Sequence, residues 1–92
     1  MKSIFDNESC YFCGAWLVEW HHVFGGAYRK KSTLYGYVCP LCIKHHNTPP
    51  DGVHFHKENR NTLKRICQKH FEQYHGNRKE FIATFGKSYA ED

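Results

Sequence analysis

The sequence predicts a small α+β domain, in which a β-hairpin and a short helix are held by a metal ion and followed by two C-terminal helices. The chain has 92 residues, 40% of them hydrophobic, which suits one domain with a modest core. Four of its five cysteines form two Cys-x-x-Cys pairs, and six of its eight histidines fall into three close pairs. A core this thin favours a metal staple, because a structural zinc ion supplies folding free energy on the order of 10 kcal/mol.

The N-terminal part predicts a knuckle followed by a strand. Residues 10–14 read Cys-Tyr-Phe-Cys-Gly, which is typical of a zinc knuckle, a tight turn that places two thiolates side by side. Residues 15–24 are rich in aromatic and β-branched side chains and predict the first strand. We expect Gly25 and Gly26 to end it.

The middle of the chain predicts the rest of the hairpin and a short helix. We expect residues 27–34 to form a polar, basic loop, and residues 34–38 to form a second strand antiparallel to the first. From Leu41, a short helical turn should carry the next cysteine and two histidines. Residues 47–52 are dense in turn formers and predict a loop.

Two helices are predicted at the C-terminal end. From about Lys57 to Tyr74, apolar side chains recur at helical spacing along one face, and lysines and arginines cover the other. Gly76 suits the position after a helix end, and Asn77 suits an N-cap. A second helix should run from Arg78 to about Phe85.

Composition sets the broad class of protein. Mean hydropathy is -0.72, and no apolar run approaches the ~20 residues of a membrane helix. Residues 1–6 turn acidic at once and carry no apolar signal core, so we expect a cytoplasmic protein without a membrane partner. The formal charge of +4 is compatible with a polyanionic partner.

The cysteine pairs indicate a structural zinc site, because cysteines at this spacing in a chain without a secretion signal point to metal binding before disulfides. Cys10 and Cys13 supply two ligands. By spacing alone, the other two are Cys39 and Cys42, or Cys42 and His45. We expect the remaining cysteine to be buried in the long helix.

The histidine pair at the end of the first strand indicates a second site. Side chains alternate across a strand, so His21 and His22 should point to opposite faces, one toward a metal and the other toward a substrate. A single histidine is more often an ordinary surface or core group. The interpretation depends on the His-His pair, the following Gly-Gly and the downstream Cys-x-x-His-His occurring together.

These motifs resemble those of the HNH endonucleases, the ββα-metal or His-Me finger nucleases, and in particular small HNH proteins of bacterial prophages. The matching residues are His-His-x-x-Gly-Gly at 21–26, Pro-Leu-Cys-x-x-His-His-Asn at 40–47 and Gly-Val-His-Phe at 52–55. The resemblance covers roughly residues 8–89. It implies one domain over residues 1–92, with a zinc-stapled ββα core at about 8–56 and C-terminal helices at about 57–86.

The resemblance also implies roles for single residues. His22 matches the general base that activates water for attack on a phosphodiester. His21 and His46 match ligands of the catalytic divalent ion, for which Mg²⁺, Mn²⁺, Ni²⁺ and Zn²⁺ are candidates, and His54 is our candidate third ligand. By resemblance, the structural zinc set is Cys10, Cys13, Cys42 and His45, with Cys39 as the alternative fourth ligand.

The chain departs from the family pattern at one position. The central asparagine of the motif would fall near Tyr37, where the sequence has none. Asn47 comes too late to fill that position simply, so a main-chain carbonyl could orient the base instead.

The function implied is metal-dependent hydrolysis of DNA phosphodiester bonds, leaving 3′-hydroxyl and 5′-phosphate ends. Arg29, Lys30 and Lys31 are candidates to contact backbone phosphates without reading sequence. The alternative is a non-catalytic zinc module that binds nucleic acid or a protein. The sequence leaves open the target, DNA against RNA, and whether the chain acts alone, as a homodimer or within a larger phage or recombination complex.

Overall fold

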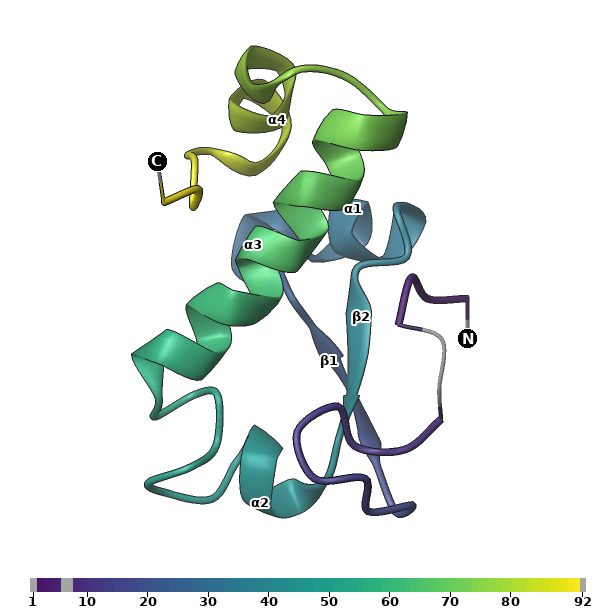
Figure 1. Cartoon of the computed structure of the whole chain (residues 1–92), viewed down its shortest axis with the longest axis vertical. Coiled ribbons are helices and arrows are strands. Elements are labelled where there is room, and N and C mark those ends of the chain that lie inside the picture. Colours follow the sequence, from purple (N-terminus) through teal and green to yellow (C-terminus); the bar gives the residue numbers. More distant parts are fainter. Residues whose placement is uncertain (1, 6–7, 92) are drawn as a thin grey trace.

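The computed structural model describes residues 2–5 and 8–91. Two strands and a set of helices build a small α+β domain, as predicted (Figure 1). In chain order the elements are β1 (Glu19–His22), the 3₁₀ helix η1 (Gly26–Tyr28), α1 (Arg29–Leu34), β2 (Val38–Leu41), α2 (Ile43–His46), α3 (Lys57–Tyr74) and α4 (Arg78–Phe85).

The hairpin is shorter than predicted, and its second strand is displaced. β1 pairs with β2 antiparallel, with Glu19 opposite Leu41 and His21 opposite Cys39. The prediction of a strand over residues 34–38 was wrong except at its last residue. Pro40 lies within β2, where it is tolerated because each strand of a two-stranded sheet has a free edge.

The prediction of a loop over residues 27–34 was also wrong, because this segment forms most of η1 and all of α1. The buried Ser32 hydroxyl accepts a hydrogen bond from the Phe24 amide at 3.1 Å and donates one to the Tyr37 carbonyl. The Tyr37 amide in turn donates to the Ser32 carbonyl at 2.7 Å. Ser32 thus ties α1 to the residues just after β1 and just before β2, a constraint that the basic side chains of this segment do not reveal.

The three remaining helices lie where they were predicted. Asn77 caps α4 in a reciprocal capping box, in which its side chain accepts from the Glu80 amide and Glu80 accepts from the Asn77 amide. His56 caps α3 by accepting from the Asn59 amide at 3.1 Å. Within the described part of the chain, no helix is long and apolar enough to span a bilayer.

The helices around the hairpin separate toward its two ends. α3 crosses the hairpin, with α1 and α4 toward one end and α2 toward the other (Figure 1). Near α4, buried aromatic rings pack together; Phe24 stacks on Phe85 with centroids 4.2 Å apart. Cys67 is buried in α3, as expected, and burial raises the pKa of its thiol well above the usual value.

Candidate metal centres

The first cluster is the predicted set Cys10, Cys13, Cys42 and His45. Their ligand atoms all lie within 4.8 Å of one another. The knuckle turn is closed by hydrogen bonds from the Gly14 amide to the Cys10 carbonyl and from the Cys10 amide to the Ala15 carbonyl, both 2.8 Å. Gly14 has a φ of 79°, a left-handed conformation that glycine adopts without a steric penalty.

The spacing of these atoms fits a zinc ion. Zn–S bonds of about 2.3 Å and Zn–N bonds of about 2.0–2.1 Å in a tetrahedron place sulfurs about 3.8 Å apart and sulfur and nitrogen about 3.6 Å apart. The Cys13 and Cys42 sulfurs are 3.6 Å apart. The His45 Nδ1 lies 3.3 Å from the Cys42 sulfur and 3.8 Å from the Cys10 sulfur. The four side chains can therefore hold a metal ion, and their chemistry suits zinc.

Backbone amides also stabilise the thiolate form of Cys10. Burial acts to raise the pKa of the Cys10 thiol, but hydrogen bonds from the backbone amides of Cys42, Cys13 and Phe12 outweigh it, and the pKa is lowered. A thiolate is the form of cysteine that binds metal.

The structure does not bring Cys39, the alternative fourth ligand, to this cluster. Its side chain is fully buried on β2, and its sulfur contacts the Pro40 carbonyl at 3.9 Å. Burial, followed by the charge of Cys10, raises the pKa of the Cys39 thiol to about 12. Cys39 behaves as a core residue, and His45 takes the fourth position.

The second cluster joins His21, His46 and His54, each from a different element or loop. Their ring centroids are 5.1 Å apart for His21 and His46, 5.3 Å for His21 and His54, and 5.0 Å for His46 and His54. We call these three residues the histidine trio. The structure thus brings together His21 and His46, the two ligands that the resemblance implies, and His54, our candidate third ligand.

A short loop carries His54 back to α2. The Val53 amide donates to the His45 carbonyl at 2.8 Å, and the His54 amide lies 3.5 Å from the His46 carbonyl. The chain at Gly52 passes close to the end of α2, where an added Cβ would lie 2.8 Å from the Thr48 nitrogen. Glycine is therefore required at Gly52 for the loop to place His54 beside His46.

Within the trio, His21 has the surroundings that best suit a metal ligand. It is 6% exposed, and among the described residues its Nε2 is the one buried side-chain nitrogen or oxygen that has no hydrogen-bond partner. Burial, followed by the charges of His46 and His54, lowers the pKa of His21 to about 3. The imidazole is therefore neutral at pH 7, with nitrogen lone-pair chemistry that suits a metal ion.

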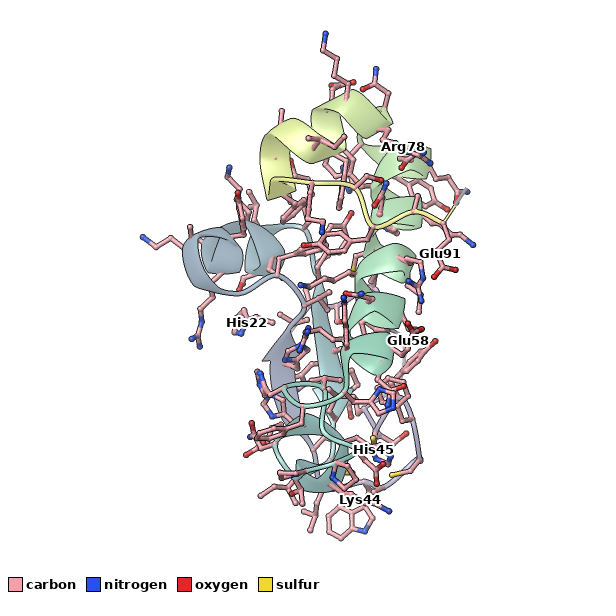
Figure 2. All side chains as sticks on the ribbon, turned by 90° about the vertical axis from the view of Figure 1, so that its left-hand side faces the viewer. His22, Lys44, His45, Glu58, Arg78 and Glu91 are labelled. Atoms are coloured by element: carbon pink, nitrogen blue, oxygen red, sulfur yellow. The ribbon has the colours of Figure 1, made fainter. Side chains whose placement is uncertain are left out.

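His22, the next residue, is half-buried, whereas His21 is buried. Figure 2 shows it beside the hairpin, between the α1 end and the end that carries His45. Burial, followed by the charge of Arg29, lowers the pKa of His22, so the ring is neutral at pH 7. Within residues 2–5 and 8–91, no residue forms a hydrogen bond with this ring, so neither an asparagine nor a main-chain carbonyl orients it.

The three basic candidates lie in the first turn of α1 rather than in a loop. All three are exposed. Lys31 points toward α4, because its ammonium donates to the Thr84 carbonyl at 3.3 Å. Arg29 is the one whose charge acts on His22.

Sequence reasoning missed two residues that contact the histidine trio. Glu19 Oε1 lies 2.7 Å from Nδ1 of His46, and Asn47 Nδ2 donates to the same oxygen at 3.2 Å. The only available signal was that Glu19 lies two residues before His21, on the same side of a strand.

Comparison with protein-family models, curated proteins and solved structures finds no match to this chain. Its function is therefore inferred from the geometry of the two clusters.

Proposed function

We propose that this protein is a metal-dependent endonuclease of the HNH type, which hydrolyses phosphodiester bonds of DNA. The observation that carries the proposal is the histidine trio, with the unpartnered Nε2 of His21 inside it and the neutral imidazole of His22 directly after it. The chain order of β1, β2 and α2 around this cluster supports a ββα-metal fold.

The ligand chemistry favours a transition-metal ion over Mg²⁺. The trio offers three imidazoles and includes no carboxylate, whereas Mg²⁺ prefers oxygen ligands. Zn²⁺, Ni²⁺ and Mn²⁺ remain the candidates, with Zn²⁺ and Ni²⁺ better suited to imidazole. When bound, such an ion stabilises negative charge on the phosphoryl group and on the leaving 3′ oxygen.

His22 supplies the base in this mechanism. Its neutral ring accepts a proton from a water molecule as the water oxygen attacks phosphorus. The bond between phosphorus and the 3′ oxygen breaks, which leaves a 3′-hydroxyl, once protonated by solvent, and a 5′-phosphate. The lowered pKa of His22 keeps the ring in the proton-accepting form at neutral pH.

Arg29 is the basic residue that best fits a phosphate contact near this base. It lies at the start of α1, and its charge acts on His22, so a phosphate held by its guanidinium would lie close to the imidazole. Lys30 is exposed on the same helix and suits a more distant backbone phosphate. Lys31, directed toward α4, is the weakest of the three candidates.

The test is a plasmid-nicking assay on protein carrying zinc in the thiolate cluster, with Ni²⁺, Mn²⁺, Zn²⁺ or Mg²⁺ added. We expect nicking that EDTA abolishes and that His22→Ala reduces by about 10²–10⁴-fold, the usual contribution of a general base. Lys57→Ala, an exposed change on α3, is the control. Full activity of His22→Ala at an unchanged metal content would refute the mechanism.

One observation favours the alternative of a zinc-dependent binding module. Three large apolar side chains are exposed around the thiolate cluster: Trp16 at 79%, Leu17 at 69% and Ile43 at 64%. The hairpin register brings the start of β1 next to the end of β2, so the three lie at the same end of the molecule. If this protein binds one zinc ion and no second ion, and does not cleave DNA, these results would favour the zinc-dependent binding module.

A further inference from the structure

A carboxylate contacts one member of the histidine trio. Glu19 opens β1 and His46 ends α2, yet Glu19 Oε1 lies 2.7 Å from His46 Nδ1 across 27 positions of sequence. The His46 side chain is 15% exposed and that of Glu19 is 51% exposed. We propose that Glu19 is a positioning residue for the metal centre, which acts through His46 and binds no metal itself. The proposal deepens the proposed function, since it assumes that the trio binds a divalent ion.

The contact fixes which nitrogen of His46 faces the ion. An ionised carboxylate only accepts hydrogen bonds, so a distance of 2.7 Å requires the proton to lie on Nδ1. With Nδ1 occupied by that proton, Nε2 is the one atom of His46 that can bind metal, and it does so as the neutral imidazole that metal binding requires. The hydrogen bond also holds the ring plane and makes Nε2 more basic, as carboxylates do for metal-bound histidines in general.

Asn47 decides between the two tautomers of His46. Its amide nitrogen lies 3.2 Å from His46 Nδ1 and 3.2 Å from Glu19 Oε1. An unprotonated Nδ1 could accept from Asn47, but its lone pair would then face a carboxylate oxygen at 2.7 Å, which is repulsive. The amide therefore donates to Glu19, and it holds the carboxylate in place against His46. Asn47 thus supports the contact between Glu19 and the ligand His46, and it does not orient the general base His22.

The role is one of orientation and not of folding. Glu19 is half exposed, and its loss leaves no buried group without a partner except the His46 Nδ1, which lies near solvent and near Asn47. Glutamine is the conservative replacement, because its carbonyl oxygen can still accept from Nδ1. Asp51 is a matched control: its carboxylate is 45% exposed, it contacts Lys44 at 3.8 Å, and it makes no hydrogen bond to a histidine of the trio.

The experiment measures metal binding without nucleic acid. The full chain is loaded with one equivalent of Zn²⁺, which fills the thiolate cluster, and is then titrated with Ni²⁺ or Co²⁺ by calorimetry and visible absorption. We expect Glu19→Ala to weaken the second ion by about 10–100-fold, the usual cost of losing such an outer partner. Glu19→Gln should recover most of that loss, Asn47→Ala should show a smaller loss, and Asp51→Ala should match the wild type. The zinc content and the thermal midpoint of the zinc-loaded protein should stay unchanged in all four variants.

Two results would overturn the proposal. One is a second-ion affinity in Glu19→Ala within twofold of the wild type, and the other is a wild type that takes up no second ion. If Glu19→Ala weakens the second ion but the wild type does not nick DNA, the positioning role holds and the nuclease proposal fails. If the wild type nicks DNA and Glu19→Ala binds metal normally, the nuclease proposal stands and the positioning role falls.

Discussion

Replacement of His21 by leucine should reduce the loss of stability that this protein suffers as the pH falls below 6.5. The folded-state pKa of His21 is about 3, against an ordinary value of 6.5, because the ring is buried beside two other histidines. Between these two values the unfolded chain binds a proton at this residue and the folded chain does not. Stability from this group is therefore complete above pH 6.5 and is lost progressively as the pH falls from 6.5 toward 3.

The size of the effect follows from the two pKa values. At pH 5.5 the unfolded histidine is about nine-tenths protonated and the folded one is almost fully neutral. Proton binding to His21 in the unfolded chain therefore lowers the free energy of unfolding by about 1.4 kcal/mol between pH 7.5 and pH 5.5, since one pKa unit corresponds to about 1.36 kcal/mol. His21→Leu cannot bind a proton, so its free energy of unfolding should fall by about 1.4 kcal/mol less than that of the wild type over the same interval.

The assay is urea unfolding followed by circular dichroism at pH 7.5 and 5.5, with one equivalent of Zn²⁺ and no second ion. Protonation of the zinc ligands affects wild type and variant alike, so the difference between them isolates His21. At pH 7.5 the leucine variant should be at least as stable as the wild type, because it removes a buried nitrogen without a partner. His75→Leu controls for replacing an exposed histidine. Equal pH dependence in wild type and His21→Leu, within about 0.3 kcal/mol, the size of ordinary non-additivity, would refute this account of the trio.

Three further predictions concern the fold. Cys13→Ala should abolish tight zinc binding and leave the chain largely unfolded, because a structural zinc supplies on the order of 10 kcal/mol; metal analysis and far-ultraviolet circular dichroism would show this, and a folded, zinc-free variant would contradict it. Cys39→Ala should keep one zinc per chain at a cost of about 1–2 kcal/mol, as for a small buried side chain, whereas His45→Ala should lose the zinc; the opposite pattern would exchange their roles. Ser32→Ala should destabilise the domain by about 1–3 kcal/mol in chemical unfolding, because the Phe24 amide loses its buried acceptor, whereas Ser88→Ala, a half-buried serine near the C-terminus, should cost less.

The sequence was most informative where the decisive interactions are local. The α3 and α4 boundaries follow from helical periodicity and from the Asn77 cap, which acts within one turn. The thiolate cluster follows from two short spacings, each of which brings its own pair of ligands together. The preference for His45 over Cys39 came from the resemblance and not from spacing; in the structure, β2 buries Cys39 in the core and α2 carries His45.

Where the decisive partner lies far along the chain, sequence reasoning failed. α1 depends on Ser32, whose hydroxyl joins Phe24, just after β1, to Tyr37, just before β2. The second strand was placed too early because the aromatic residues before it matched strand propensity, although they pack into the core from a turn. The one signal for Glu19, its place two residues before His21, does not reveal its partner on α2, which comes 27 residues later.

The adjacency of His45 and His46 makes this part of the chain intolerant of changes in length. One residue faces the thiolate cluster and the next faces the histidine trio, so the rotation of α2 assigns each imidazole to its own cluster. Inserting or deleting a single residue between Cys42 and His45 would turn the following residues by about 100°, since a helix has 3.6 residues per turn. Both clusters would lose a ligand at once. We therefore expect evolution and engineering to accept almost no change of length in α2.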